Sequence, residues 1–246
     1  MQLTRESLLS GELARLVAAH EGASAMTEEQ MRRSREMVLA KLPAGRDLWL
    51  FAYGSLIWNP TFHHVERRVA RLHGYHRRFC LWTWLGRGTR ERPGLTLGLD
   101  RGGSCGGVAF RIASTEVETE LDAIWRREMV TNAYRPTWVR LRCGGEMLAA
   151  VTFVINHAHE RYVRSIRDEE VADVIATAEG QLGPCRDYLF NTVAHLEALG
   201  IQDRGLVRLA EAVRFRAAGP NSQLSGASPS PCPDATAARP PRSGPR

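Results

Sequence analysis

The feature that most constrains the fold is a continuous apolar run over residues 48–53, which ends in Gly54 and Ser55. A short apolar run bounded by turn residues is typical of a strand that is buried on both faces. Such a strand needs other elements on each side of it, so it cannot form in a small open hairpin. We therefore predict a core strand that leads directly into a tight turn.

Further strand patterns follow this run and lie close together in the sequence. Residues 69–75 and 78–84 each predict a strand, and 95–100 and 106–112 predict a pair around a turn at Arg101-Gly102-Gly103. Residues 138–142 and 147–155 flank Cys143-Gly144-Gly145, which is the pattern of a hairpin. Together they favour a mostly antiparallel sheet.

Helices are predicted in the middle and late parts of the chain. Ser114 or Thr115 is expected to cap a helix that runs to about Val130, with glutamates in its first turns. Three more helices are expected at about 168–179, 186–199 and 203–216. Because the strands come first and the helices gather late, the fold class is predicted to be α+β, with a small barrel or curved sheet and flanking helices.

Two end segments differ from this central region, 46–216. Residues 1–45 predict a helical extension. Its first part has apolar residues at helical spacing, namely Leu8, Leu9, Leu13, Leu16 and Val17. Thr27 then begins a helix whose apolar side is expected to consist of Met31, Met37, Val38 and Leu42. Residues 217–246 contain seven of the twelve prolines and almost nothing to bury, so we expect this tail to be disordered.

Composition excludes several classes of protein. The chain is 43% apolar and 24% charged, which is ordinary for a soluble globular protein. No apolar run approaches the roughly 20 residues that cross a bilayer, so we expect no membrane partner. The first residues do not resemble a signal peptide, which predicts a cytoplasmic protein. The sequence gives no indication of the oligomeric state.

The cysteines and common motifs indicate neither a metal nor a nucleotide cofactor. The five cysteines are dispersed, with no CxxC pair, which argues against a disulfide framework and a zinc site. His157 and His159 could form a metal pair, but no carboxylate of known spacing completes it. The chain has no GxGxxG or GxxxxGK[ST] phosphate loop, no HExxH and no GxSxG.

Two local features could carry chemistry. The turn at 53–56 follows a buried strand, and its consecutive backbone N–H groups could hold a carboxylate or a developing oxyanion, or the turn could be structural only. Glu128 lies on a helix face that is otherwise apolar, where a carboxylate is costly unless it has a partner or a task. A salt bridge to Arg127 or Arg135 is the alternative explanation for Glu128.

An ordered set of segments resembles the ChaC family of γ-glutamylcyclotransferases. The set spans about 47–199 and consists of 51–58 (FAYGSLIW), 74–79 (GYHRRF), 86–89 (GRGT) with Pro93-Gly94, 106–111 (GGVAFR), Arg127-Glu128-Met129 with Tyr134, and Asp187-Tyr188-Leu189. The resemblance implies a small β-barrel with flanking helices, no metal and no cofactor. It also implies cleavage of γ-glutamyl peptides, chiefly glutathione, to 5-oxoproline and Cys-Gly.

The resemblance also implies roles for individual residues. Glu128 matches the catalytic glutamate of the family, and Tyr188 matches a tyrosine near the site. The substrate-binding segment is matched by Phe51, Ala52, Tyr53, Gly54, Ser55 and Leu56. Tyr134 and Arg87 are further candidates. Arg90 departs from the family pattern, which has proline in this loop, and this puts the closure or selectivity of the loop in doubt.

Two other functions stay open at this point. One is a cyclotransferase that acts on other γ-glutamyl amino acids or amines. The other is a nucleic-acid-binding protein, because the net charge of +6 comes from an arginine-rich stretch at 46–110 that includes Arg67-Arg68 and Arg77-Arg78. No aromatic RNA-stacking motif or helix-turn-helix pattern accompanies these arginines.

Overall fold

The computed structural model describes residues 3–21 and 25–218, and its centre is a closed barrel of five strands. Around the barrel the order is β1-β3-β2-β4-β5. The strands are β1 (Leu48–Ala52), β2 (Glu66–Thr83), β3 (Gly94–Ile112), β4 (Tyr134–Cys143) and β5 (Glu146–Ile155). All neighbours are antiparallel except β1 and β5, which pair in parallel at Leu50 and Val151. The predicted α+β barrel is confirmed.

Strands β2 and β3 are longer than the sequence patterns predict. The expected pair of strands around Arg101-Gly102-Gly103 is wrong, since these residues lie within β3, which pairs along its length with β2. Likewise, the predicted strands 69–75 and 78–84 both fall in the single strand β2, which ends at Thr83, one residue before the predicted end. Gly74 (φ 85°) and Gly102 (φ 97°) lie near a register shift between His73 and Tyr75. These left-handed residues form an irregularity that interrupts the strand pattern without reversing the chain.

One helix follows the first three barrel strands, and three more helices follow the last two strands. Helix α4 (Val117–Glu128) begins at Glu116 with no side-chain cap, so the predicted cap at Ser114 or Thr115 is wrong. The amide of Ser114 instead donates to Asp47. Helices α5 (Asp168–Thr177), α6 (Cys185–Ala198) and α7 (Arg204–Ala218) confirm the late helical region. Helix α7 extends two residues past its predicted end, and the predicted tail from 219 onward lies outside the described residues.

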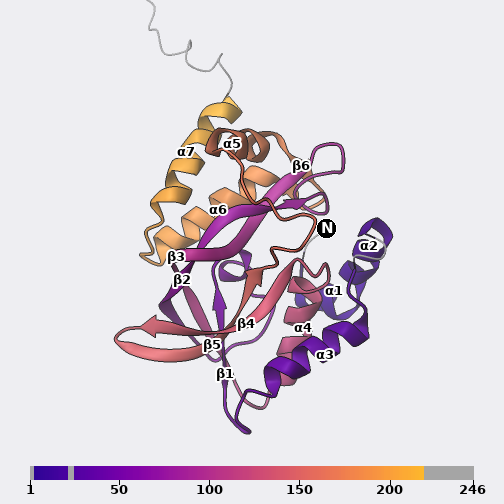
Figure 1. The fold of residues 1–246 in the computed structure, drawn as a ribbon, viewed down its shortest axis with the longest axis vertical. Coiled ribbons are helices and arrows are strands. Elements are labelled where there is room, and N and C mark those ends of the chain that lie inside the picture. Colours follow the sequence, from indigo (N-terminus) through magenta and orange to yellow (C-terminus); the bar gives the residue numbers. More distant parts are fainter. Residues whose placement is uncertain (1–2, 22–24, 219–246) are drawn as a thin grey trace, which may run out of the picture.

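The N-terminal helices pack beside α4, on one side of the barrel, whereas α5, α6 and α7 gather at another end (Figure 1). They are α1 (Arg5–Leu9), α2 (Glu12–Glu21) and α3 (Glu28–Leu39). Thr27 and Gln30 form a reciprocal capping box at the start of α3, which confirms this helix start. Met31 and Val38 are buried, but Met37 is 67% exposed and was wrongly expected on the apolar side.

Two small strands, β6 (Glu179–Gly180) and β7 (Gly183–Pro184), form a hairpin between α5 and α6. The amide of Leu182 in this hairpin donates to the carbonyl of Gly86, which lies in the loop between β2 and β3. This contact ties the β2–β3 loop to the late helical region. None of the helices within 3–21 and 25–218 is long and apolar enough to cross a membrane.

Candidate active site

The end of β1 and the turn after it are fixed by hydrogen bonds with two other strands, β2 and β5. Thr152 of β5 donates its hydroxyl to the carbonyl of Phe51 at 2.9 Å, and Arg77 of β2 donates to the carbonyl of Tyr53 at 2.6 Å. The Tyr53 hydroxyl crosses to the carbonyl of Phe153 at 2.8 Å. The chain then enters a short 3-10 turn, η2 (Ser55–Ile57). At the start of such a turn, the first amide groups have no acceptor within the turn.

Gly54 has no side chain at the point where this turn meets helix α6. A Cβ atom built on Gly54 would lie 3.0 Å from the hydroxyl oxygen of Tyr188 and 3.7 Å from a methyl carbon of Leu97. The glycine therefore allows the tyrosine hydroxyl to approach the backbone of the turn closely. The Tyr188 ring is itself positioned by edge contacts with Trp58 and Phe79.

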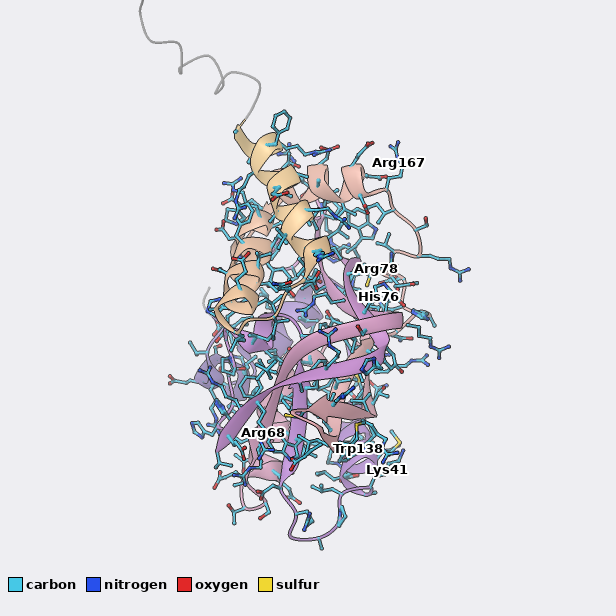
Figure 2. All side chains as sticks on the ribbon, turned by 90° about the vertical axis from the view of Figure 1, so that its left-hand side faces the viewer. Lys41, Arg68, His76, Arg78, Trp138 and Arg167 are labelled. Atoms are coloured by element: carbon cyan, nitrogen blue, oxygen red, sulfur yellow. The ribbon has the colours of Figure 1, made fainter. Side chains whose placement is uncertain are left out.

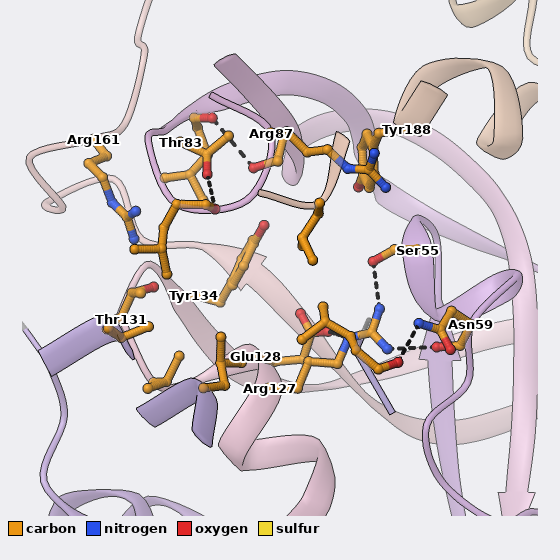
Figure 3. A pocket seen from close by; sticks show the side chains of 18 of the residues that line it. Ser55, Asn59, Thr83, Arg87, Arg127, Glu128, Thr131, Tyr134, Arg161 and Tyr188 are labelled. Carbon is orange, nitrogen blue, oxygen red and sulfur yellow. Dashed lines mark hydrogen bonds and ion pairs between the residues drawn. The ribbon is translucent and has the colours of Figure 1, made fainter. Parts of the chain in front are cut away.

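The end of helix α4 places Arg127 and Glu128 against the same turn (Figure 3). Arg127 Nη2 donates to Ser55 Oγ at 2.9 Å, and its Nη1 donates to the carbonyl oxygen of Asn59 at 2.6 Å. The Nε atom of Arg127 lies 3.2 Å from Glu128 Oε1. The salt bridge that offered an alternative explanation for Glu128 therefore exists with Arg127, but the arginine is shared with the turn.

The carboxyl group of Glu128 is largely shielded from solvent. Its side chain is 15% exposed, and that of Arg127 is 5% exposed. Burial raises the pKa of Glu128 above its ordinary value, because desolvation disfavours the charged form, although the charge and hydrogen bond of Arg127 act in the opposite direction. A carboxyl group with a raised pKa can accept and return a proton more readily near neutral pH.

Two tyrosine side chains complete the surroundings of Glu128. The hydroxyl of Tyr134 donates to the carbonyl of Leu97 at 2.8 Å. Burial raises the pKa of Tyr134 and of Tyr188 well above the ordinary value, and the nearby Glu128 carboxylate adds to the effect. Both hydroxyl groups therefore stay protonated at neutral pH and can act as hydrogen-bond donors.

Two cavities meet at Glu128. The smaller, of about 30 Å³, is lined by Phe51, Ala52, Tyr53, Gly54, Ser55, Leu56, Leu97, Glu128, Tyr134, Phe153 and Tyr188. The larger, of about 530 Å³, has a volume typical of small-molecule sites. Ser55, Glu128, Tyr134 and Tyr188 line both. The structure thus brings the candidate residues from β1, α4, β4 and α6 to one place.

The loop between β2 and β3 contributes to the larger cavity. Arg87 lines it and donates from Nη1 to the carbonyl of Pro184 at 3.2 Å. Arg90, the departure from the family pattern, is exposed, stacks over Trp84 at 5.5 Å and is not among the residues that line the cavity. Arg161 lines the cavity and is buried against the same tryptophan at 5.1 Å.

Several lining residues were not identified from the sequence. From the sequence, Arg127 was expected at most to form a salt bridge with Glu128. Its hydrogen bond to Ser55 could not be predicted, because the two residues lie far apart in the chain. Leu3, Leu13 and Val17 also line the larger cavity. The helical spacing of Leu13 and Val17 indicated an apolar side, but nothing in it indicated what that side faces.

The two histidines of the 157–159 segment bind different partners. His157 Nε2 lies 2.7 Å from Asp100 Oδ1, and His159 Nε2 lies 2.9 Å from the carbonyl oxygen of Thr131. Across 3–21 and 25–218, no three side chains of His, Cys, Asp or Glu gather as a metal site would require.

Comparison with known proteins identifies the family. The model of the ChaC-like protein family matches residues 48–216, well over half of the chain. This chain belongs to the ChaC-like family. The matched region contains β1, α4, β4 and α6, and so all the elements that meet at Glu128. The resemblance found in the sequence is thereby confirmed.

Two curated relatives, one from a bacterium and one from an animal, are similar to this chain over much of its length. A glutathione-specific γ-glutamylcyclotransferase of Escherichia coli (strain K12) is 38% identical over 213 residues, which cover 86% of this chain and 92% of the relative. Glutathione-specific γ-glutamylcyclotransferase 1 of Mus musculus is 31% identical and covers 68% of this chain and 78% of the relative. The bacterial match covers more of the chain than lies after residue 47, so it includes part of the N-terminal segment.

A solved structure of a yeast protein shares the fold. The crystal structure of a yeast γ-glutamyl cyclotransferase specific to glutathione superimposes with a TM-score of 0.63 at 22% identity. The superposition covers 69% of this chain and 96% of the yeast chain. The likeness therefore extends over nearly the whole of the yeast protein and supports the barrel with its flanking helices.

Proposed function

We propose that this ChaC-like protein is a γ-glutamylcyclotransferase, a lyase that cleaves glutathione to 5-oxoproline and Cys-Gly. The observation that carries the proposal is the position of Glu128, which lies where the small and the large cavity meet. Its pKa is raised by burial, and it is surrounded by protonated tyrosine hydroxyls. The names of the bacterial and animal relatives supply the choice of glutathione as substrate.

The reaction is intramolecular and needs only a proton carrier. The α-amine nitrogen of the γ-glutamyl group attacks the carbonyl carbon of its own γ-amide, and a carbon–nitrogen bond forms that closes a five-membered lactam. The bond from that carbon to the cysteine nitrogen then breaks. Because the two reacting groups are already tethered, holding them in the right geometry can contribute roughly 7–11 kcal/mol to the rate in well-oriented cases.

Glu128 would carry the proton between the two nitrogens. The α-amine is an ammonium at neutral pH, so it must lose a proton before it attacks. The departing cysteine amine must gain one. A single carboxylate placed between them accepts the first proton and returns it to the leaving group, which is general base and then general acid catalysis. No covalent intermediate on the protein is required.

The turn after β1 would hold the γ-glutamyl end. The small cavity of about 30 Å³ has room for a group of about carboxylate size, since one water needs roughly 10–15 Å³ on this measure. Backbone amides of Gly54, Ser55 and Leu56 are the donors available there for the α-carboxylate or the tetrahedral oxyanion. The Ser55 hydroxyl and the Tyr188 hydroxyl lie at the boundary of the two cavities.

Positive charge lines the rest of the site. Arg87 and Arg161 line the larger cavity, and Arg127 lies beside Glu128. Glutathione carries two carboxylates and one ammonium, so it is an anion overall at neutral pH. A cavity lined by guanidinium groups favours such a substrate and increases its local concentration.

Incubation of the purified protein with glutathione tests this function. We expect 5-oxoproline and Cys-Gly to appear in equal amounts, with no added metal or cofactor. Parallel incubations with γ-glutamyl amino acids and γ-glutamylamines test the alternative substrates. Turnover of those compounds with no turnover of glutathione would replace the glutathione assignment, and no turnover of any γ-glutamyl compound would contradict the reaction itself.

Nucleic-acid binding is less well supported than the cyclotransferase reaction, because arginines of the arginine-rich strands pair with carboxylates of the protein itself. Arg77 is buried and pairs with Asp203 at 2.9 Å, and Arg78 pairs with Asp100 at 2.9 Å. Arg68 pairs with Glu66 and Glu146. Figure 2 shows the labelled arginines Arg68, Arg78 and Arg167 at different levels along the molecule. We infer that these side chains serve the barrel and that nucleic acid is not a partner.

The state of the cysteines is consistent with a reducing compartment. Cys80, Cys105, Cys143 and Cys185 are all buried free thiols. Buried free thiols are usual for proteins of the cytoplasm, where disulfides are rare. We therefore propose a cytoplasmic location, where the substrate would be reduced glutathione.

A further inference from the structure

The segment before residue 48 lies outside the region matched by the family model, yet Leu3 and helix α2 reach the larger cavity. The side chains of Leu3, Leu13 and Val17, which we call the N-terminal wall, line the same cavity as Glu128. Val17 is 1% exposed, and Leu8 of α1 is equally buried. The segment is thus packed against the barrel domain and contributes an apolar side to its site.

A buried ion pair anchors this segment to α4. Arg5 donates from Nη2 to Glu120 Oε1 at 2.8 Å and from Nε to Glu120 Oε2 at 3.3 Å. The Glu120 side chain is fully buried and also accepts from the amide of His63 at 3.0 Å. A buried carboxylate that loses its partner is strongly unfavourable, so this pair fixes where the segment lies.

A second link joins the N-terminal wall to the catalytic end of α4. Asn59 Nδ2 donates to the carbonyl of Leu3 at 3.1 Å, and the carbonyl of Asn59 accepts from Arg127. In Figure 3, Asn59 and Arg127 lie on the same side of the pocket as Ser55. Asn59 therefore fixes the position of the N-terminal wall relative to Arg127 and Glu128.

The division of the two cavities indicates what the wall would contact. Leu3, Leu13 and Val17 line only the larger cavity, whereas Gly54 and Leu56 line only the smaller one. If the γ-glutamyl end is bound at the turn, the part of the substrate beyond the scissile bond must extend into the larger cavity. That part is the Cys-Gly half, whose cysteine offers a methylene and a thiol to an apolar surface.

We propose that Leu13, with the buried Val17 one helical turn further along α2, forms the apolar surface against which the Cys-Gly half of the substrate packs, and so determines which leaving groups the enzyme accepts. This inference rests on the proposed function. The wall also reduces the access of water to the side of Glu128 that faces the leaving group.

Leu13→Asp is the sharpest test, with Leu9→Asp as a matched control. Leu13 is partly exposed and lines the cavity, whereas Leu9 is 37% exposed and does not. A carboxylate at position 13 would repel an anionic substrate and remove apolar contact. We expect the KM for glutathione to rise at least tenfold, with kcat within threefold of the wild type. Leu9→Asp should match the wild type in both.

Product inhibition then locates the effect. Leu13→Asp should weaken inhibition by Cys-Gly and leave inhibition by 5-oxoproline unchanged, which a general loss of structure would not do. Val17→Ala and Leu13→Ala give a second measurement if the aspartate variant does not fold, and each should raise KM at least threefold. A KM within twofold of the wild type in folded variants overturns the proposal. Absence of 5-oxoproline from the wild type would overturn the proposed function instead.

Discussion

The guanidinium group of Arg127 donates a hydrogen bond of 2.9 Å to the hydroxyl of Ser55. This bond ties the last turn of helix α4 to the turn that follows strand β1. Ser55 and Arg127 are separated by 71 residues of chain that include two long barrel strands. Because Glu128 is the next residue, the bond also fixes the distance between the proposed proton carrier and the proposed binding turn.

Replacing Arg127 should change the pH dependence of turnover. The charge of Arg127 opposes the rise that burial imposes on the pKa of Glu128. In Arg127→Gln that opposition is lost, so the pKa of Glu128 should increase further and the acid limb of the kcat profile should move to higher pH. Because glutathione is the substrate in both assays, its own ionisation contributes equally to both pH profiles. A difference between the profiles therefore comes from a group of the enzyme.

Arg126→Gln is the control for this experiment. Arg126 adjoins Arg127 in sequence but pairs with Glu28 and Asp122, and it does not line the cavity. Its profile should overlay that of the wild type. An unchanged acid limb in a folded Arg127→Gln variant would mean that Glu128 does not set that limb.

Gly54→Ala should weaken substrate binding while the barrel remains folded. The new Cβ would lie 3.0 Å from the Tyr188 hydroxyl, so either the tyrosine or the turn must shift by a few tenths of an ångström. We expect KM for glutathione to rise several-fold, and Gly54→Val to raise it further because it adds two methyl groups at the same place. The comparison with Gly205→Ala, whose φ is not left-handed and whose Cβ would approach no atom nearer than the side chain of Asp203 at 3.4 Å, separates this from a general glycine effect. Equal kinetics in wild type and Gly54→Val would show that the turn is structural only.

The sequence predicted the elements of the barrel better than their connections. The apolar run that became β1 and the hairpin of β4 and β5 follow from local patterns alone. The double length of β3 did not, because glycines such as Gly102 mark a turn and an irregular strand equally well in sequence. Only the register with β2, which pairs Leu97 with Phe79 and Val108 with Val69, distinguishes the two.

The site was predicted in part for a similar reason. Glu128 stood out because it is a carboxylate on an apolar helix face, and the turn stood out because it follows a buried strand. The contribution of Leu13 and Val17 could not be foreseen, since an apolar helix side facing a cavity has the same spacing as one facing a core. Which of the two it faces depends on tertiary contacts such as that of Arg5 with Glu120.

Stability at acid pH should depend on Asp100. Burial acts to raise its pKa, but bonds from His157, the Arg101 amide, Arg78 and Tyr162 outweigh this and lower it from 3.8 to about 2. A carboxyl group whose pKa is lower in the folded protein stabilises the fold when the pH is above the pKa of the unfolded chain. This contribution is lost as the pH falls from 3.8 toward 2.

Asp100→Asn tests this dependence through melting temperatures. The variant should melt well below the wild type at neutral pH, and the difference should shrink as the pH approaches the lowered pKa. Glu118→Gln, at an exposed position of α4, serves as the control and should follow the wild type throughout. A difference between Asp100→Asn and the wild type that is constant with pH would contradict the assignment.

Turnover of glutathione by Glu128→Gln, measured with thermal melting on the same preparation, tests the central claim most directly. Glutamine keeps the volume of the side chain and can accept from Arg127, but it cannot carry a proton at neutral pH. We predict that kcat falls by about 10²–10⁴ or more, the usual contribution of general acid–base catalysis, while the variant melts close to the wild type and still binds glutathione. A variant that melts early but turns over glutathione at the wild-type rate would contradict the account and leave Glu128 as a structural partner of Arg127.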